Sequence, residues 1–269
     1  MPDFVGSYHD HFAVLRADTP ERLDEAYRLR YRVYCVENQF EDPERCPDGR
    51  EVDEDDDRAV HTLLVHRRSG AAVGTARLIL PQPGGGRPLP VHRTVRPRAL
   101  AAFRRLSPRH TAEVSRFAVS KEFRRRRGEE RHADAGFPGG GLGPAASERR
   151  LLPHITLGLV RGILGICLEY EITILAAMME PALLRVLRRL GLEFEPLGPL
   201  VEHHGLRQPC VAHIAELIRS TRDRDGPLWW YVEADVCAIA ARPATLNAAR
   251  GTDAGRLSAA EISSARGFR

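Results

Sequence analysis

Glu113-Val114-Ser115-Arg116-Phe117-Ala118-Val119 is the stretch of sequence that decides the fold. Its β-branched and aromatic residues predict a strand, which ends where Ser120 and Lys121 interrupt the apolar run. Two charged residues, Glu113 and Arg116, fall inside this predicted strand. A buried charge is costly unless it has a partner or a chemical task. The strand therefore belongs either to an ion-pair network or to a site that carries chemistry.

The segments around this strand alternate between helical and extended patterns. Thr19, Pro20 and Glu21 predict a helix start, because they suit the N-cap, the first turn and the positive end of the helix dipole. Periodicity and turn residues predict, in order, a helix over 20–38, a strand hairpin over 61–66 and 72–80, a short helix over 94–106, the Glu113 strand, an apolar helix over 147–170, a strand over 172–178, a helix over 181–190, strand regions over 192–203 and 210–214, and a helix over 215–221. This order indicates an α/β fold with a mixed, mostly antiparallel sheet and helices on both faces.

A single domain is expected over residues 1–236. Within it, residues 124–149 form a Gly-rich, low-complexity insert with little that could build a core, and we expect this insert to be mobile. Trp229-Trp230-Tyr231 is expected to be part of the core or a wall of an acyl pocket, rather than a platform for stacking nucleic-acid bases. Residues 237–269 are rich in Ala, Arg and Gly, and they predict a disordered tail.

Bulk composition favours a soluble globular protein, since 43% of the 269 residues are hydrophobic and 28% are charged. Met1–Thr19 lacks the apolar core of a signal peptide, and Leu157–Met179 is interrupted by charged residues, which argues against a transmembrane segment. The cysteine count is odd and no C-x-x-C motif occurs, so we expect reduced thiols in a cytoplasmic protein. The cysteines are Cys35, Cys46, Cys167, Cys210 and Cys237.

Charge is unevenly placed along the chain, although the formal net charge is only +4. Glu51–Asp57 is almost wholly acidic, whereas Arg124, Arg125, Arg126 and Arg127 form a basic run. Such a run attracts nucleic acid, an acidic protein or a phosphorylated ligand, or it is simply a solvated loop.

Several charged residues occupy positions that the helix and strand periodicity predicts to face the protein interior. Three are cations and three are anions, so they balance as a buried network if every member is hydrogen-bonded. A network of this kind also lines polar pockets, and both interpretations stay open. The six residues are Arg30, Asp53, Asp56, Arg77, Glu113 and Arg116.

No metal site is expected. Glu202-His203-His204 is the strongest candidate, but adjacent histidines in a strand point to opposite faces and no third ligand is evident.

Five motifs, in order along the chain, resemble those of the acyl-homoserine-lactone (autoinducer) synthases. They are Leu29-Arg30-Tyr31-Arg32-Val33-Tyr34 with Phe40, Asp53-Glu54-Asp55-Asp56, Gly74-Thr75-Ala76-Arg77-Leu78, Glu113-Val114-Ser115-Arg116-Phe117, and Glu180-Pro181-Ala182-Leu183-Leu184-Arg185 with Gly191.

The sequence is still more similar to a sister group, the N-acyl amino acid synthase-like proteins. Within that group it most resembles the bacterial acyltransferases associated with the PEP-CTERM/exosortase system. The motifs are residues 31–37, 113–120, 179–184 and 198–202, with Gln208-Pro209-Cys210. All these families share the GNAT acyltransferase fold, so the resemblance implies that fold.

The resemblance implies an N-acyltransferase that moves a fatty acyl group from a thioester to the amine of an amino acid or similar small acceptor. The donor is acyl carrier protein or coenzyme A, and no permanently bound cofactor is implied. Glu113 would be the general base, and Ser115 would orient the thioester or protonate the leaving thiolate. The backbone N–H groups of Phe117, Ala118 and Val119 would hold the pantetheine arm and polarise the thioester carbonyl.

The resemblance also implies roles for the other charged residues. Arg30, Asp53, Asp56, Arg77 and Arg116 would shape the acceptor pocket, with Tyr34 and Phe40 as its walls. The alternative is that the arginines are scaffold partners of the carboxylates. The Arg124–Arg127 run would dock an acidic carrier protein, because the insert after Gly128 interrupts the loop that holds the coenzyme A pyrophosphate in many GNAT proteins.

Three other functions stay open. An acyl-homoserine-lactone synthase would use S-adenosylmethionine as acceptor. A basic nucleic-acid-binding protein would use Arg124–Arg127 and bind in a salt-dependent way, although no nucleic-acid module is recognised. A non-catalytic GNAT protein would bind an acylated carrier without turnover.

Overall fold

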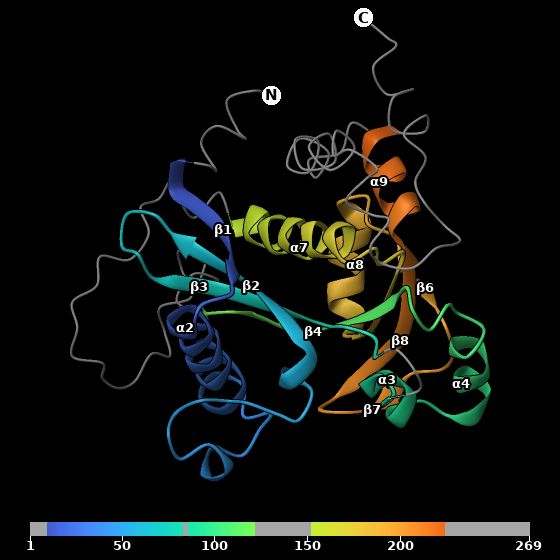
Figure 1. The fold of residues 1–269 in the computed structure, drawn as a ribbon, viewed down its shortest axis with the longest axis horizontal. Helices are drawn as coiled ribbons and strands as arrows, with labels where there is room; N and C mark the ends of the chain where they lie inside the picture. The colour runs from blue at the N-terminus through green and yellow to red at the C-terminus, as the bar shows by residue number, and fades with distance from the viewer. Residues whose placement is uncertain (1–9, 83–85, 122–151, 224–269) are drawn as a thin grey trace, which may run out of the picture. The chain divides into compact units, whose positions relative to one another are not determined.

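The structure, a computed structural model, describes residues 10–82, 86–121 and 152–223 (Figure 1). The chain divides into two compact units. The first comprises residues 1–77 and 116–162, and the second comprises residues 78–115 and 163–269. Three elements continue across these limits along the chain: β3 (Ala72–Ile79), β4 (Thr111–Val119) and α7 (Leu152–Glu169).

In the first unit, strands β1 (Phe12–Ala17), β2 (Ala59–His66) and β3 lie side by side in that order. β1 runs antiparallel to β2, with Phe12 opposite His66 and Ala17 opposite His61. The predicted β2–β3 hairpin is confirmed. Strand β1 is not foreseen by the sequence analysis, because its run of Phe, Ala, Val and Leu shows no alternation.

The first predicted helix is confirmed as α2 (Pro20–Tyr31), which continues without a break as a π-helix, η1 (Arg32–Glu37). Thr19 caps α2 as expected, because its extended backbone lets its side chain accept a hydrogen bond from the N–H of Arg22 at 3.4 Å. A π-helical turn is rare and often lies at a functional site.

Helices cover both faces of β2 in the first unit, as expected. Leu63 packs with Ala26 of α2 and Ala17 of β1. Its neighbour Thr62 lies against Gly162 of α7. Because successive side chains of a strand point to opposite faces, α2 and α7 lie on opposite sides of β2.

Gly162 allows α7 to approach β2 closely. A Cβ atom there would overlap the Thr62 side chain and lie 2.9 Å from Cγ1 of Val14. We therefore expect Gly162→Ala to reduce the free energy of unfolding by about 1–3 kcal/mol, through overpacking. Gly165 on the same helix has no atom within 4 Å of such a Cβ. Gly165→Ala is the matched control, and we expect it to be neutral or stabilising in the same urea titration. Equal effects of the two substitutions would contradict this packing.

In the second unit, β4, β5 (Ile174–Met179), β8 (Leu206–His213) and β6 (Glu195–Pro196) lie in that order, and β7 (Val201–Glu202) pairs with β8. β4 and β5 are parallel, whereas the pairs of β8 with β5, β6 and β7 are antiparallel. The prediction of a mixed, mostly antiparallel sheet is confirmed.

The helices of the second unit are α3 (Pro90–Thr94), α4 (Pro97–Phe103), α8 (Pro181–Arg189) and α9 (Ile214–Asp223). The short helix expected over residues 94–106 is confirmed as α4, but it starts only at Pro97, and a separate helix, α3, precedes it. Pro97 disfavours a helical backbone at the preceding residue, and both Val95 and Arg96 are extended. Helix α8 is confirmed, and it is followed by Gly191 with φ of +83°.

The strand region predicted over residues 192–203 contains only the two-residue strands β6 and β7. By contrast, β8 begins at Leu206, four residues before its predicted start, because Pro209 does not end it. None of the helices in the described ranges has the length and apolarity that crossing a bilayer requires. The predictions for residues 124–149, for Trp229-Trp230-Tyr231 and for the 237–269 tail fall outside the described residues.

Candidate functional site

Arg30, in the last turn of α2, is completely buried and fully paired. Its Nε donates to Glu51 at 2.6 Å, while Nη1 and Nη2 donate to the two oxygens of Asp56 at 2.6 and 3.0 Å. The guanidinium also lies 5.3 Å from the ring centre of Tyr27. The expected acidic partner of Arg30 is therefore confirmed, and every nitrogen of this guanidinium is used within the protein.

Arg77, on β3, is the second buried cation, with only 2% of its side chain exposed. Its Nη1 donates to Asp53 at 2.5 Å and to Asp56 at 2.8 Å, and its Nη2 donates to Asp53 at 2.9 Å. Asp56 is thus shared between Arg30 and Arg77, and it joins α2 to β3.

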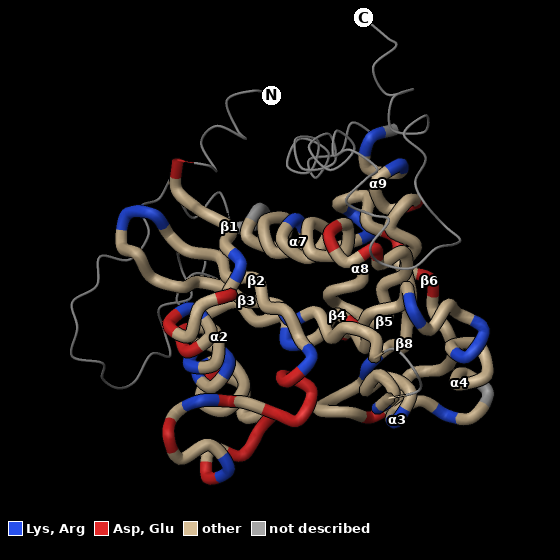
Figure 2. Tube along the Cα trace, viewed as in Figure 1, with Lys and Arg blue, Asp and Glu red and all other residues tan. Residues whose placement is uncertain are grey.

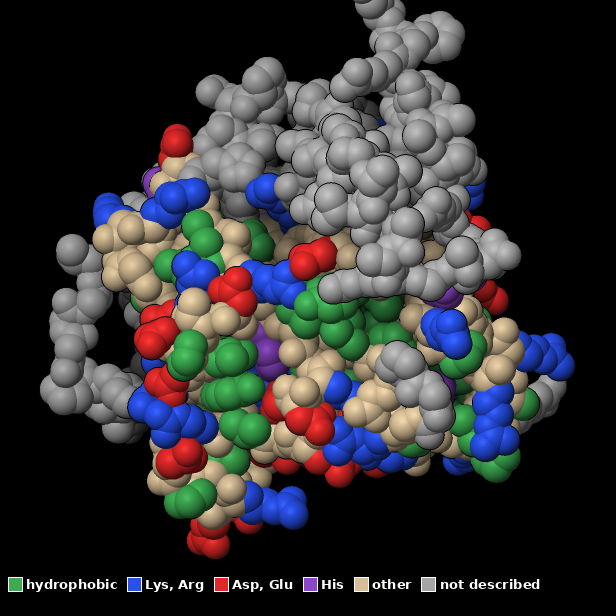
Figure 3. Space-filling model, viewed as in Figure 1, with side chains coloured by type: hydrophobic (Ala, Val, Ile, Leu, Met, Phe, Trp, Pro, Cys, Tyr) green, Lys and Arg blue, Asp and Glu red, His purple; other side chains and the backbone are tan. Residues whose placement is uncertain are grey.

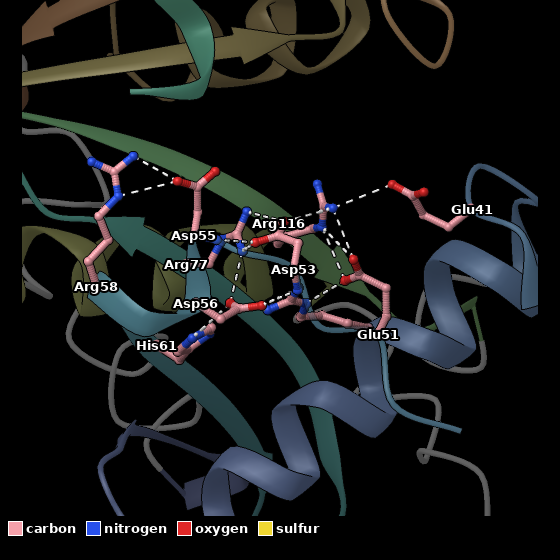
Figure 4. A network of polar contacts seen from close by, with 10 residues as sticks. Glu41, Glu51, Asp53, Asp55, Asp56, Arg58, His61, Arg77 and Arg116 are labelled. Carbon is pink, nitrogen blue, oxygen red and sulfur yellow. Dashed lines mark hydrogen bonds and ion pairs between the residues drawn. The ribbon is translucent and has the colours of Figure 1, made fainter. Parts of the chain in front are cut away.

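Arg116, on β4, completes the network shown in Figure 4. Its Nη2 lies 2.9 Å from Glu51, 3.0 Å from Asp53 and 3.4 Å from Glu41. The guanidinium stacks 5.4 Å from the ring centre of Tyr34, which in turn contacts the ring of Phe40 at 6.2 Å. The network brings together five of the six predicted charged residues, and the two expected aromatic walls lie at its Arg116 side.

The acidic segment turns its carboxylates inward through its own backbone. Asp53 accepts a hydrogen bond from the N–H of Asp55 at 2.9 Å, and Asp56 accepts one from the N–H of Asp53 at 2.8 Å. These turns are typical of Asp, whose side chain bonds nearby backbone groups. At the start of the segment, the N–H of Glu51 donates to the carbonyl of Tyr27 on α2. The segment is therefore tied both to itself and to the helix.

Glu51, Glu41 and His61 are members of the site that the sequence analysis missed (Figure 4). Glu51 is only 5% exposed and bridges Arg30 and Arg116. Its position two residues before the predicted Asp53 was a usable signal. No pattern distinguished Glu41 or His61 from the other polar residues nearby.

Three carboxylic acids of the network, Glu51, Asp53 and Asp56, have lowered pKa values. Burial alone would raise the pKa of each, but neighbouring hydrogen-bond donors and the arginine charges outweigh it. Arg30 and Arg116 lower the pKa of Glu51, Arg77 lowers that of Asp53, and His61 with Arg30 lowers that of Asp56. Burial alone would lower the pKa of Arg30 and Arg116, because it disfavours their charged forms. Their carboxylate partners outweigh this effect and raise the pKa of both.

His61 lies beside Asp56 in this cluster. Its Nε2 lies 3.3 Å from Asp56, but neither ring nitrogen has hydrogen-bond geometry with a described residue. Burial lowers the pKa of His61, because an imidazolium there would lose its hydration next to Arg30 and Arg77. Its ring packs edge-on against Tyr27 at 5.5 Å.

Stability should fall in two stages as the pH is lowered. The pKa of His61 is lower in the folded state than in the unfolded chain, so stability decreases below about pH 6.5. The carboxylic acids also have lowered pKa values, so stability decreases more steeply below about pH 4. Urea titrations between pH 8 and 3 test this, and a constant free energy of unfolding across that range would contradict it.

Exposure divides the network into an inner and an outer part. Arg30 and Arg77 are buried, whereas Arg116 is 18%, Glu41 20% and Asp53 27% exposed. With three arginines and the carboxylates of Glu41, Glu51, Asp53 and Asp56, the network carries one net negative charge. Its outer edge, defined here as Arg116, Glu41 and Asp53, is therefore the part with access to solvent, whereas Arg30 and Arg77 are enclosed.

Strand β4 has an irregular backbone at Arg116, which adopts φ of +48°. A left-handed backbone is unusual for a residue with a Cβ and marks a local distortion of the strand. The register of β4 with β5 ends two residues earlier, where Val114 lies opposite Ala177. The predicted strand is thus regular up to Val114 and distorted at Arg116, immediately before Phe117.

Glu113 lies in the second unit and is buried on β4. One of its carboxylate oxygens accepts a hydrogen bond from the N–H of Val91, in α3, at 2.7 Å. Ser115, two residues further along β4, is half-buried. These contacts hold the Glu113 carboxylate in one place. Whether Glu113 and Ser115 are catalytic stays a prediction.

Glu37 fastens the end of η1 to the end of β4, and the sequence analysis did not single it out. Its carboxylate accepts hydrogen bonds from Oγ of Ser120 at 3.2 Å and from the N–H of Lys121 at 2.9 Å. Nζ of Lys121 in turn donates to the Glu37 carbonyl. The N–H of Ser120 also donates to the Val73 carbonyl on β3 at 3.1 Å.

We expect Glu37→Gln to reduce the free energy of unfolding by about 1–2 kcal/mol, since hydrogen bonds to a charged group are lost. Amide hydrogen exchange at Lys121 should become faster. Glu44→Gln, at an exposed position of the acidic segment, is the control and should change stability by less than about 0.5 kcal/mol. An unchanged exchange rate at Lys121 would rule out this role.

The remaining predicted sites are less informative. Arg124–Arg127 lies outside the described residues. Cys35, Cys46, Cys167 and Cys210 are free thiols and buried. His203 and His204 were expected in a strand, but they lie in the turn before β8. There His204 has φ of +51°, and the two ring centres are 4.6 Å apart. Among the described residues, no group of three or more metal-ligating side chains occurs.

Comparisons with known proteins concern the fold. Residues 29–133 match the family model described as an acetyltransferase (GNAT) domain. The acyl-homoserine lactone synthase BjaI, a coenzyme A-dependent enzyme solved with MTA, is 23% identical over 81% of this chain and 90% of its own, with a TM-score of 0.53. TofI, in a complex with an inhibitor and MTA, is 19% identical over 79% of this chain and 96% of its own, with a TM-score of 0.51.

FeeM, an N-acyl amino acid synthase from uncultured soil microbes, is 18% identical over 78% of this chain and 94% of its own, with a TM-score of 0.49. No curated protein matches the chain. The protein has the GNAT acyltransferase fold, as the sequence motifs imply.

Proposed function

We propose that this protein is an N-acyltransferase that moves a fatty acyl group from a phosphopantetheine thioester to the amine of an amino acid or similar small acceptor. The GNAT fold supports the class of reaction. The observation that carries the proposal is the distorted backbone of β4 at Arg116, directly before Phe117, Ala118 and Val119.

The distortion of β4 at Arg116 supports a binding site for the acyl donor on this strand. N–H groups of a strand alternate between its two edges, and that of Ser120 points to β3. We therefore expect the N–H groups of Phe117 and Val119 to point away from β3, where they are available to a pantetheine amide and a thioester carbonyl. Backbone donors held in this way stabilise the oxyanion that forms when the carbonyl is attacked.

The outer edge of the network has the charges that binding of an amino acid acceptor requires. Glu41 and Asp53 suit an ammonium group, while Nη1 of Arg116 makes no hydrogen bond with a described residue and suits a carboxylate. An α-amino acid carries both groups. Tyr34 and Phe40 would contact its side chain, as the resemblance implies.

The proposed step is an ordinary aminolysis. The bound ammonium group first gives one proton to Glu113, and the resulting neutral amine attacks the thioester carbon. The tetrahedral intermediate then collapses and the carbon–sulfur bond breaks. Ser115 is the proposed donor of a proton to the leaving pantetheine thiolate, and it takes the second proton of the acceptor nitrogen in exchange. The products are an amide and a free thiol.

The proposal is tested by expressing the protein in a bacterial host and analysing the extracted lipids by mass spectrometry. We expect N-acyl amino acids to accumulate, with the chain length of the host's donors, and to be absent with a Glu113→Gln variant. Accumulation of acyl-homoserine lactone instead would favour use of S-adenosylmethionine, since that cation also suits a negatively charged edge. The association with the PEP-CTERM/exosortase system stays a prediction of the sequence.

A further inference from the structure

The chain contains a long segment without acidic residues. Between Arg58 and Glu113 there is no Asp or Glu, but there are ten arginines. Those at both ends of α4 and in the turn after it are exposed, and Figure 2 shows the basic positions clustered around this helix. They are Arg96, Arg104, Arg105 and Arg109, and we name them the α4 arginine cluster.

These arginines differ from three arginines of the first unit. Arg22, Arg28 and Arg50 each form an ion pair with a nearby Asp. In the described ranges, by contrast, no ion pair involves a member of the α4 arginine cluster. The positive charge on this part of the surface, visible in Figure 3 as basic side chains on the α4 side, is therefore not neutralised by its surroundings.

The cluster is held by a rigid support. Arg96 precedes α4 and Arg104 follows it, so about 10 Å of helix separates them. Ala99 and Phe103 anchor the helix through their burial. The neighbouring α3 is bonded to β4 through the N–H of Val91 and the carboxylate of Glu113. The cluster thus belongs to the segment that also positions the proposed general base.

The chemistry of the cluster favours an acidic protein over other anions. Exposed guanidinium groups spread along about 10 Å suit several carboxylates on a protein face, whereas one phosphate needs convergent donors. Single-stranded nucleic acid calls for exposed aromatic rings beside the cations, and Phe103 is buried. Acyl carrier proteins are acidic, and they present a thioester on a pantetheine arm.

We propose that the α4 arginine cluster is the docking surface for an acyl carrier protein that delivers the thioester. This inference rests on the proposed function, because it names the donor of that reaction. Docking through exposed charge pairs increases the association rate and weakens as salt concentration rises.

The test compares two donors, acyl carrier protein and acyl-pantetheine, which carries the same thioester without the protein. In the variant Arg104→Glu, Arg105→Glu, Arg109→Glu, we expect KM for the acyl carrier protein to rise at least tenfold and KM for acyl-pantetheine to stay within twofold. The matched control is Arg185→Glu, Arg188→Glu, Arg189→Glu on α8, which exchanges three exposed arginines of the same unit for the same charge. It should leave both KM values within threefold.

A second measurement is independent of turnover. Titration of fluorescently labelled holo carrier protein should show binding to the wild type that weakens with salt and is lost in the α4 variant. Circular dichroism and the triple alanine variant at the same positions check that the fold is kept. If carrier binding and its KM are unchanged in the α4 variants, the docking surface is refuted. If the carrier binds through the cluster but neither donor is consumed, the proposed function fails while the docking surface stands.

Discussion

Replacing Asp56 by asparagine should reduce the free energy of unfolding by about 3–5 kcal/mol, because it leaves two buried guanidinium groups without their shared counter-charge. Asp56 accepts hydrogen bonds from Arg30 on α2 and from Arg77 on β3. An asparagine can still accept with one oxygen, but its amide group would direct N–H donors at a cation. The loss is a large fraction of the stability of an ordinary domain.

Urea or thermal unfolding measures this effect, with Asp48→Asn as the matched control. Asp48 is 57% exposed and pairs with Arg50 at 3.2 Å. A surface pair of this kind contributes little, so the control should lose less than about 1 kcal/mol. A loss below 1 kcal/mol for Asp56→Asn as well would show that the network does not hold the fold together.

Glu113→Gln should lower kcat for amide formation by about 10²–10⁴-fold, the usual contribution of a general base. Glutamine keeps an oxygen that accepts the N–H of Val91, so the packing of α3 on β4 should survive. The donor KM should therefore change little.

The comparison that separates catalysis from structure is Glu113→Ala. If Glu113 only holds Val91, the alanine variant loses stability and activity together while the glutamine variant keeps both. If Glu113 is the base, both variants lose activity, but only the alanine variant loses stability. A glutamine variant with kcat within threefold of the wild type would remove Glu113 from the chemistry.

Some features of the site follow from local sequence and others depend on the tertiary structure. Arg30 was recognised because a charge on the apolar stripe of an amphipathic helix requires a partner. The start of α2 at Thr19 is equally local. Which carboxylates would meet Arg30 was only partly predictable. Glu51 and Asp56 lie in an acidic run, and the Asx turns of that run, formed only in the folded loop, select the ones that face inward.

The partner of Glu113 could not be predicted from the sequence either. Its hydrogen bond comes from the backbone of Val91, 22 residues earlier, and no side-chain pattern indicates that contact. The left-handed backbone at Arg116 also has no signal in the sequence, since positive φ is usually indicated by a glycine. The helix boundary at Pro97, by contrast, was visible in the sequence, because proline restricts the residue before it.

The burial gradient of the network suggests how it contributes to function. Hydrogen bonds join Arg30, Arg77, Glu51 and Asp56, and they fix α2, β3 and the acidic segment in one arrangement. Arg116 and Asp53 then stand at a partly exposed edge with their positions already determined. A preorganised edge of this kind costs little reorganisation when a charged acceptor binds.

Incubation of the purified protein with acyl carrier protein thioester and a mixture of amino acids, followed by thiol titration and mass spectrometry, tests the central claim most directly. We expect one equivalent of free thiol for each N-acyl amino acid formed, and formation of both products about 10²–10⁴-fold slower when the Glu113→Gln variant replaces the wild type. Thiol release without amide, or no consumption of carrier-protein, coenzyme A or pantetheine thioesters with any amine, would contradict the assignment of this protein as an N-acyltransferase.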